Sequence, residues 1–125
     1  MGIDEIMDML DENKPKEEQE KAYSIAKDIK CINVFLQPCH MEHNKNVWNN
    51  CARVLADRGD DELKPYLVEL FRWLQDQNWP GFDIIKNRLK KYNHDKYFFY
   101  VLSESIAIAK ALKDDVWLNN LREFV

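Results

Sequence analysis

The sequence predicts an all-α protein of about seven helices, stacked in pairs as a short α-α superhelix. Apolar residues recur at spacings of three and four along most of the 125-residue chain, which is the period of an amphipathic helix. Only three glycines and four prolines are present, too few for the many turns of an all-β fold. A chain of this length and hydrophobic content can bury one core, so we expect residues 1–125 to form a single domain.

Two acidic helices are predicted within residues 1–30. Their apolar stripes are Ile3, Ile6, Met7 and Leu10 in the first, and Ala22, Ile25, Ala26 and Ile29 in the second. Pro15 suits the first turn of the second helix, where an amide hydrogen would have no partner within the helix. These 30 residues carry nine acidic and five basic side chains, whereas the remaining residues carry thirteen of each. The net charge of −4 therefore belongs to this N-terminal helix pair.

The chain is less regular between residues 31 and 45. Residues 32–36 either continue the second helix or run extended to Pro38. Residues 37–45 are polar and show no period, which predicts a loop.

Two amphipathic helices are predicted between residues 46 and 76. Asn46 is a suitable N-cap for the first, and Gly59 is expected to follow it in the left-handed conformation. Pro65 is tolerated only in the first turn of a helix, so the second is expected from about residue 64 to residue 76. Their inward faces are, in turn, Trp48, Cys51, Ala52 and Leu55, and Leu63, Leu67, Leu70 and Leu74.

Three further helices are predicted toward the C-terminus. The first spans about residues 80–91. The second, residues 96–112, is apolar on nearly every side and is therefore expected to be buried. Asp114 and Asp115 are placed to cap the last helix. Residues 46–76 and 80–112 each form a helix, a tight turn and a second helix, and such pairs in series are typical of an α-solenoid. A compact, non-repeating bundle is the alternative.

A dense polar and aromatic corner lies between two of these helices. It reads Leu70-x-x-Trp73-Leu74-Gln75-Asp76-x-Asn78-Trp79-Pro80-Gly81, preceded by Leu55-x-x-x-Gly59-Asp60-x-x-Leu63-x-Pro65-Tyr66-Leu67. Together with Tyr100-Val101-Leu102, these motifs resemble a small bacterial family catalogued as domain of unknown function 5071, over about residues 40–125. The resemblance implies an α-α superhelix similar to HEAT-like repeats, in a family whose members are sometimes similar to immunity proteins against bacterial toxins. It carries no known activity, so it implies no catalytic residue and no cofactor.

The corner admits two interpretations. In the first, Asp76 and Asn78 satisfy unpaired backbone groups at two helix ends, while Trp73 and Trp79 fill the space between helix pairs. In the second, Trp73, Asp76, Asn78 and Trp79 form a partner-binding surface, because exposed aromatic side chains are typical of binding hot spots. Asp76 alone, without a neighbouring nucleophile or base, does not predict catalysis.

Cysteine and histidine residues gather near the irregular segment. They are Cys31, Cys39, His40, His43 and Cys51. Thiolates and imidazoles are zinc ligands, but no Cys-x-x-Cys pair is present and Cys51 falls on an apolar helix face. The sequence therefore assigns no metal site. A small metal-dependent protein or enzyme that uses Cys39, His40 and His43 is the alternative function.

A basic run precedes the apolar helix. It consists of Lys86, Arg88, Lys90, Lys91 and Lys96, with Tyr92 and His94 interleaved. Most such runs are solvated helix faces, and a mildly acidic chain is poorly suited to nucleic acid, whose phosphates must be neutralised. Glu104 is a carboxylate on the apolar helix, so we expect it at the surface, near Arg72 or Lys110.

These features predict a protein-interaction module that is not an enzyme and binds neither nucleic acid nor membrane. In an immunity-like form it would bind and occlude a toxin, with the acidic N-terminal residues covering a basic partner. The N-terminus lacks the basic and apolar regions of a secretory signal, and the longest apolar run, residues 97–102, is too short to span a bilayer. Three cysteines cannot all pair with one another, so we expect reduced thiols and a cytoplasmic protein.

Overall fold

The computed structural model describes residues 2–40 and 43–125, apart from the side chains of Cys39 and His40. Every regular element within these residues is a helix, which confirms the predicted all-α class. The α-helices are α1 (Ile3–Met9), α2 (Lys16–Ala26), α3 (Gln37–His40), α4 (Trp48–Ala56), α5 (Asp60–Leu63), α6 (Leu67–Arg72), α7 (Phe82–Lys91), α8 (Lys96–Ala111) and α9 (Asp115–Arg122). The 3₁₀ helices are η1 (Ile32–Phe35), η2 (Lys45–Val47), η3 (Lys64–Tyr66) and η4 (Trp73–Gln75).

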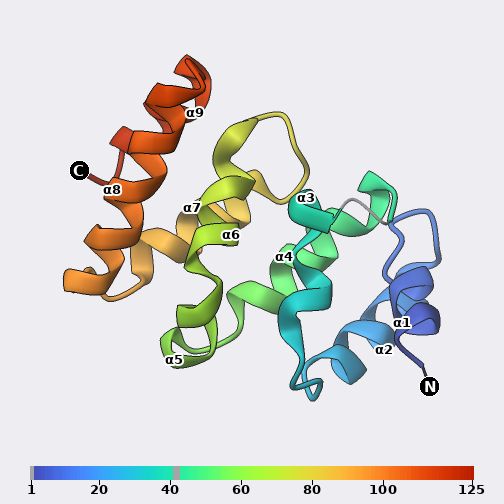
Figure 1. Cartoon of the computed structure of the whole chain (residues 1–125). Helices are drawn as coiled ribbons and strands as arrows, with labels where there is room; N and C mark the ends of the chain where they lie inside the picture. The colour runs from blue at the N-terminus through green and yellow to red at the C-terminus, as the bar shows by residue number, and fades with distance from the viewer. Residues whose placement is uncertain (1, 41–42) are drawn as a thin grey trace.

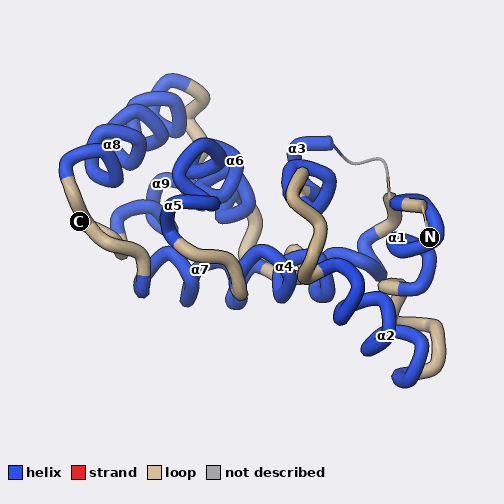
Figure 2. The backbone as a smooth tube through the Cα atoms, turned by 90° about the horizontal axis from the view of Figure 1, so that it is seen from below, coloured by secondary structure: helices blue, strands red, loops and turns tan. Residues whose placement is uncertain are grey.

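The helices form an elongated array with the two chain termini at opposite ends (Figure 1). Helices α3, α6 and α8 follow one another in one layer, and α2, α4 and α7 follow one another in the other (Figure 2). Close packing joins the neighbours within each layer, while α1 packs against α2 at one end and α8 against α9 at the other. This arrangement is a short α-α superhelix rather than a compact bundle, because each element contacts mainly its neighbours along the array.

The helices that pack as pairs are not the ones that the sequence predicts. The sequence predicts that α4 pairs with α6 and that α7 pairs with α8, but in the described part of the chain the closest backbone neighbours of these helices are other elements. Instead, η4 at the end of α6 packs against α7, and α8 packs against α9. The lengths of successive elements indicate a repeat, but they do not show at which helix the repeat begins.

Two short helical turns occupy the segment predicted to be irregular. Residues 32–35 form η1, rather than continuing α2 or running extended, and α3 lies inside the predicted loop 37–45. Ile32, Phe35 and Leu36 are buried, and η1 packs against α4. Tertiary packing therefore orders a segment whose own sequence lacks a helical period.

Two predictions at helix ends are wrong. Asn44 is the capping residue rather than Asn46, since its Oδ1 accepts a hydrogen bond from the Asn46 amide at 2.8 Å and η2 precedes α4. Gly59 is extended, with φ −72° and ψ 163°, because it serves as the N-cap of α5. The helix predicted over residues 64–76 is helical from residue 64 to residue 75, as η3, α6 and η4 in succession, and its inward leucines are buried as predicted.

Helix α8 is buried on one face only. The buried residues are Phe98, Val101, Leu102, Ser105 and Ala109, and the exposed apolar residues include Tyr97, Phe99, Tyr100 and Ile108. The predicted burial on every side is therefore wrong. Helix α8 is the last element of its layer, so α6 and α9 cover part of its surface and no further helix in the described residues covers the rest (Figure 2).

Candidate functional site

The predicted corner is a structural joint built around buried tryptophans. The Trp73 side chain is 0% exposed, and its Nε1 donates a hydrogen bond to the Pro80 carbonyl at 3.0 Å. Trp48 lies between the other two rings: its centroid is 6.1 Å from that of Trp73 and 5.6 Å from that of Trp79, both in edge-to-face geometry. These contacts hold α4, η4 and the start of α7 together, and edge-to-face pairs add stability beyond their buried area.

Asp76 satisfies a backbone group of the corner, as the first interpretation predicts, whereas the Asn78 side chain has no hydrogen bond among the described residues. The Asp76 Oδ1 accepts a hydrogen bond from the Asn78 amide at 2.8 Å, and the Asp76 carbonyl accepts one from the Trp79 amide at 3.1 Å. This local bonding is typical of an aspartate in a turn.

The carbonyl groups at the end of α6 and in η4 are satisfied by α9. The Trp117 Nε1 donates to the Phe71 carbonyl at 3.0 Å, and the Asn120 Nδ2 donates to the Leu74 carbonyl at 2.8 Å. Carbonyl groups near a helix C-terminus have no partner within the helix, so these two side chains complete the hydrogen bonding of the joint. The sequence places Trp117 and Asn120 more than 40 residues away in the chain, and no local motif links them to the corner.

The four residues predicted to bind a partner have different positions. Trp73 is wrong as a surface residue, because its ring is completely enclosed and bonded within the joint. Asp76 and Trp79 are half-buried and Asn78 is exposed. A partner contact through Asp76, Asn78 and Trp79 stays a prediction.

A groove lies between α6 and α8, with a volume of about 410 Å³. Its main lining residues are Val68 of α6 and Tyr97, Tyr100, Val101, Glu104 and Ile108 of α8. Tyr100 is 56% exposed, far more than a tyrosine buried in a core. The Lys64 Nζ lies 5.1 Å from the centroid of the Tyr97 ring, so a cation lies over an aromatic side chain at one end of the groove.

Glu104 is the carboxylate of this groove. It is exposed, as predicted, and it forms no ion pair with Arg72 or Lys110 in the described part of the chain. An unpaired carboxylate inside an apolar groove offers a binding partner one specific polar contact.

The residues of this groove are visible in the sequence as apolar residues of α8, but their pattern predicts burial rather than exposure. Aromatic and aliphatic residues occur on nearly every side of α8, and periodicity alone predicts burial for such a helix. Whether a neighbouring element covers each side depends on the position of α8 in the array, which no local pattern reports.

The cysteines and histidines do not converge on a site within the described residues. Cys31 is exposed and Cys51 is buried, and no group of three potential metal ligands lies close together there. Burial raises the pKa of the Cys51 thiol far above its usual value, so this side chain stays protonated and does not offer a thiolate. The predicted Cys39–His40–His43 metal loop depends on the side chains of Cys39 and His40, which lie outside the described residues.

The basic run is largely occupied by contacts within the fold. Lys86 pairs with Glu123 at 3.4 Å, and the Arg88 Nη2 donates to the Asp60 Oδ1 at 2.6 Å and to the Arg58 carbonyl at 2.9 Å. The His94 ring stacks on Phe98 with centroids 4.2 Å apart. Arg88 therefore links α7 to the α4–α5 connection.

We expect Asp60→Asn to lower the free energy of unfolding at pH 7 by about 0.5–1 kcal/mol, since the Asp60–Arg88 pair is partly solvated. Burial would raise the pKa of Asp60, but hydrogen bonds from Arg88 and the Asn93 amide, with the Arg88 charge, lower it below its usual value. A carboxylate with a lowered pKa in the folded state stabilises the fold above its unfolded pKa of about 4. That stabilisation is lost as the pH falls through the folded-state pKa.

Urea titrations of the wild type and Asp60→Asn from pH 7 to pH 2.5 check this expectation. The difference in unfolding free energy between the two proteins should shrink toward zero below about pH 4. Asp61→Asn, a change of the same charge at the exposed neighbouring position, serves as the control and should show a smaller difference. A difference for Asp60→Asn that does not vary with pH would contradict the proposed role of its charge.

The fold and the groove define a helical-repeat protein with an exposed apolar surface on α8, the last helix of its layer. The family described as "Domain of unknown function (DUF5071)" matches residues 41–125, and the chain belongs to this family. This match confirms the resemblance inferred from the corner motif. Searches of the curated proteins and of the solved structures found no match. Among the described residues, no helix is both long and apolar enough to cross a membrane.

Proposed function

We propose that this chain is a non-enzymatic protein-interaction module whose contact surface is the α6–α8 groove. The observation that supports this proposal most directly is the exposure of Tyr97, Tyr100 and Ile108 on one side of α8, beside Val68 of α6. Contiguous exposed apolar surface is costly in water, and in soluble proteins such patches typically mark interaction sites. Tyrosine is also enriched among the residues that contribute most to binding free energy.

The shape and chemistry of the groove favour an amphipathic helix as the bound element. Two helices of one layer form its walls, so a third helix can pack between them with its apolar face inward. Glu104 lies exposed within the groove, and an arginine or lysine of the partner would supply the matching charge. The partner is therefore a protein segment with an apolar stripe and a basic residue beside it.

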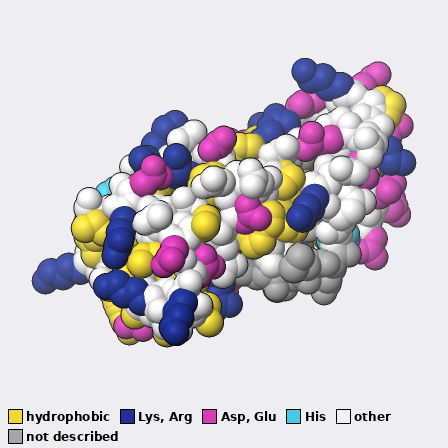
Figure 3. All heavy atoms as spheres, turned by 90° about the horizontal axis from the view of Figure 1, so that it is seen from above, with side chains coloured by type: hydrophobic (Ala, Val, Ile, Leu, Met, Phe, Trp, Pro, Cys, Tyr) yellow, Lys and Arg dark blue, Asp and Glu magenta, His cyan; other side chains and the backbone are white. Residues whose placement is uncertain are grey.

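An immunity-like role, in which the partner also contacts the acidic end of the molecule, is the more specific form of this proposal. Acidic side chains gather over the end of the molecule formed by α1 and α2 (Figure 3, right). Asp4, Glu5 and Asp8 of α1 are exposed there, and residues 2–13 contain no lysine or arginine. This charge favours a basic partner, such as a toxin that the protein would occlude in the cytoplasm.

Capture of a partner by the wild-type chain, followed by calorimetry with the purified partner, tests the proposal. Tyr100→Glu should raise the Kd at least about tenfold, because it places a charge in the centre of the apolar contact. Asn87→Glu introduces the same charge at an exposed position on α7 in the other layer and should leave the Kd unchanged. Equal thermal midpoints for the three proteins would show that the folds are intact.

Two outcomes would contradict the proposal. A partner that binds Tyr100→Glu as tightly as the wild type would place the contact elsewhere. A wild-type dimer in light scattering that Tyr100→Glu converts to a monomer would identify a second copy of the chain, rather than another protein, as the occupant.

A further inference from the structure

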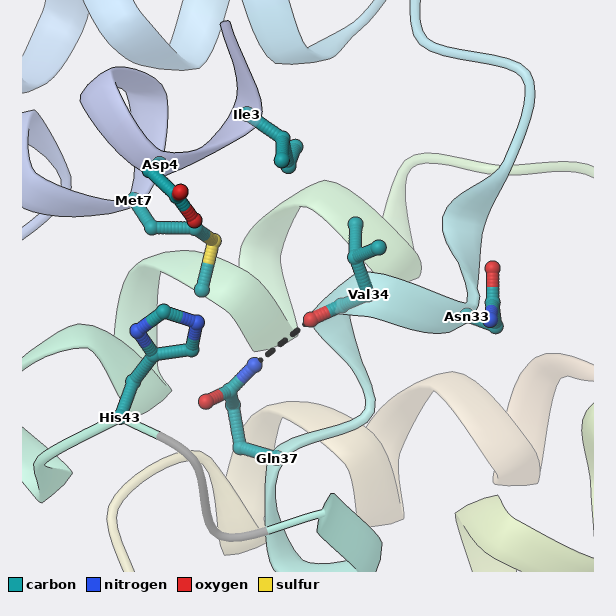
Figure 4. A pocket seen from close by; sticks show the side chains of 7 residues that line it. All are labelled: Ile3, Asp4, Met7, Asn33, Val34, Gln37 and His43. Carbon is teal, nitrogen blue, oxygen red and sulfur yellow. Dashed lines mark hydrogen bonds between the residues drawn. The ribbon is translucent and has the colours of Figure 1, made fainter.

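A second cavity lies at the opposite end of the molecule, between α1, η1, Gln37 and His43. Its volume is about 200 Å³, which is smaller than sites for drug-sized ligands and suits a single side chain or a small fragment. Figure 4 shows Ile3 and Val34 forming an apolar wall, with Met7 and His43 across from them and Gln37 at the base. All of these residues except His43 precede the segment matched to the family.

The base of this cavity carries a polar atom without a partner. Gln37 is only 1% exposed, and its Nε2 donates a hydrogen bond to the Val34 carbonyl at 2.8 Å. Its Oε1, turned toward His43 in Figure 4, accepts no hydrogen bond among the described residues. A buried carbonyl oxygen that lacks a donor costs free energy, so a ligand that donates to it is favoured.

The rim of the cavity carries one carboxylate, that of Asp4. Asp4 projects from α1 toward the cavity, as Figure 4 shows, and Glu5 and Asp8 are exposed on the same helix. The basic residue nearest to α1 in the sequence, Lys14, pairs with Asp8 at 3.4 Å. The cavity therefore combines an apolar wall, an acceptor at its base and a carboxylate at its rim.

We propose that this cavity binds an alkylguanidinium group, either a free small molecule or an arginine side chain of a peptide. An arginine carries an apolar stem that packs against aliphatic side chains, and its planar head offers five donors to more than one acceptor. The stem would contact Ile3 and Val34, while the head would donate to the Gln37 Oε1 and the Asp4 carboxylate. This site is separate from the α6–α8 groove and does not depend on the function proposed for it.

Titration of the isotope-labelled full chain with propylguanidinium chloride, followed by NMR, tests this proposal. The Met7 methyl and Gln37 side-chain amide signals should shift with a saturable Kd in the millimolar range, as expected for a ligand of this size. Propylurea has nearly the same shape without the charge, and it should produce no saturable shift at the same concentrations. Equal binding of propylurea, or the absence of saturable shifts at Met7 and Gln37, would overturn the proposal.

Variants separate the two contacts. Asp4→Asn should weaken propylguanidinium binding about fivefold, whereas Glu5→Gln, the same change at the adjacent exposed residue outside the cavity, should leave the Kd within about twofold. Gln37→Met removes the buried acceptor and should weaken binding about tenfold. Equal effects of Asp4→Asn and Glu5→Gln would overturn the proposal, and this comparison stands even if Gln37→Met does not fold.

A further titration with peptides identifies the source of the guanidinium group. An acetylated, amidated Gly-Arg-Gly peptide is compared with its citrulline counterpart, which lacks the charge. Binding of the arginine peptide at least as tight as that of propylguanidinium, with no binding of the citrulline peptide, would support a protein side chain as the ligand. Binding of propylguanidinium alone would support a free small molecule.

Discussion

Trp73→Ala is expected to lower the free energy of unfolding by about 3–5 kcal/mol. The substitution removes an indole that is 0% exposed and leaves a cavity between α4, η4 and the start of α7. It also removes the hydrogen bond from Nε1 to the Pro80 carbonyl. Because domains are stable by only about 5–15 kcal/mol, this one change would remove a large share of the total.

Urea denaturation followed by far-ultraviolet circular dichroism measures this loss. Trp79→Ala is the matched control, because Trp79 also contacts Trp48 but is only half-buried, and it should cost about 1–2 kcal/mol. Trp73→Phe keeps an aromatic ring and should fall between the wild type and Trp73→Ala. A Trp73→Ala protein within about 1 kcal/mol of the wild type would show that the corner does not hold the helices together.

The helical class and the inward faces could be predicted because they depend on local spacing. Cys51, Leu63 and Leu70 are buried as their periodicity predicts, and Asp114 caps α9 by accepting a hydrogen bond from the Trp117 amide at 3.0 Å. Each of these features is decided by residues close together in the chain, where side-chain direction follows from helix geometry.

The α6–α8 groove could not be predicted for the opposite reason. Tyr97 and Tyr100 follow the same apolar pattern as buried residues, and they are exposed because no helix of the described residues covers them. The hydrogen bonds to the Phe71 and Leu74 carbonyls could not be predicted either, because their donors come from α9, which is distant in the sequence. Sequence periodicity reports which side of a helix is apolar, whereas the topology decides what packs against it.

The left-handed conformation that the sequence predicts for Gly59 is found at Gly81 instead. Gly59 is extended where a left-handed residue is predicted, and Gly81 has φ +87°, in the left-handed region that other residues rarely adopt. The Pro80-Gly81 pair lies where the chain must turn from η4 into α7 while passing close to Trp73 and α4. Gly81 therefore meets two requirements at once, one for its backbone angle and one for space.

Gly81→Ala is accordingly expected to lower the free energy of unfolding by about 2–4 kcal/mol, from left-handed strain and overpacking together. A Cβ at this position would lie 2.8 Å from the Trp73 Cζ2, 2.9 Å from the Ala52 Cβ and 3.2 Å from the Trp48 carbonyl oxygen. None of these atoms is the end of a flexible side chain, so α4 or the Trp73 ring would have to move. Such a movement would also disturb the Trp48–Trp73 contact.

Gly59→Ala is the matched control for this substitution, because the same methyl group there meets no atom within 4 Å and φ is −72°. It should change the free energy of unfolding by no more than about 1 kcal/mol, since a lower entropy of the unfolded chain offsets the weaker cap of α5. Urea titrations of both variants measure the difference. If Gly81→Ala were as stable as Gly59→Ala, the approach of α7 to the tryptophan joint would have to be looser than these contacts indicate. The expected gap between the two variants follows from the tight packing of the corner, which leaves no room for a single added carbon atom.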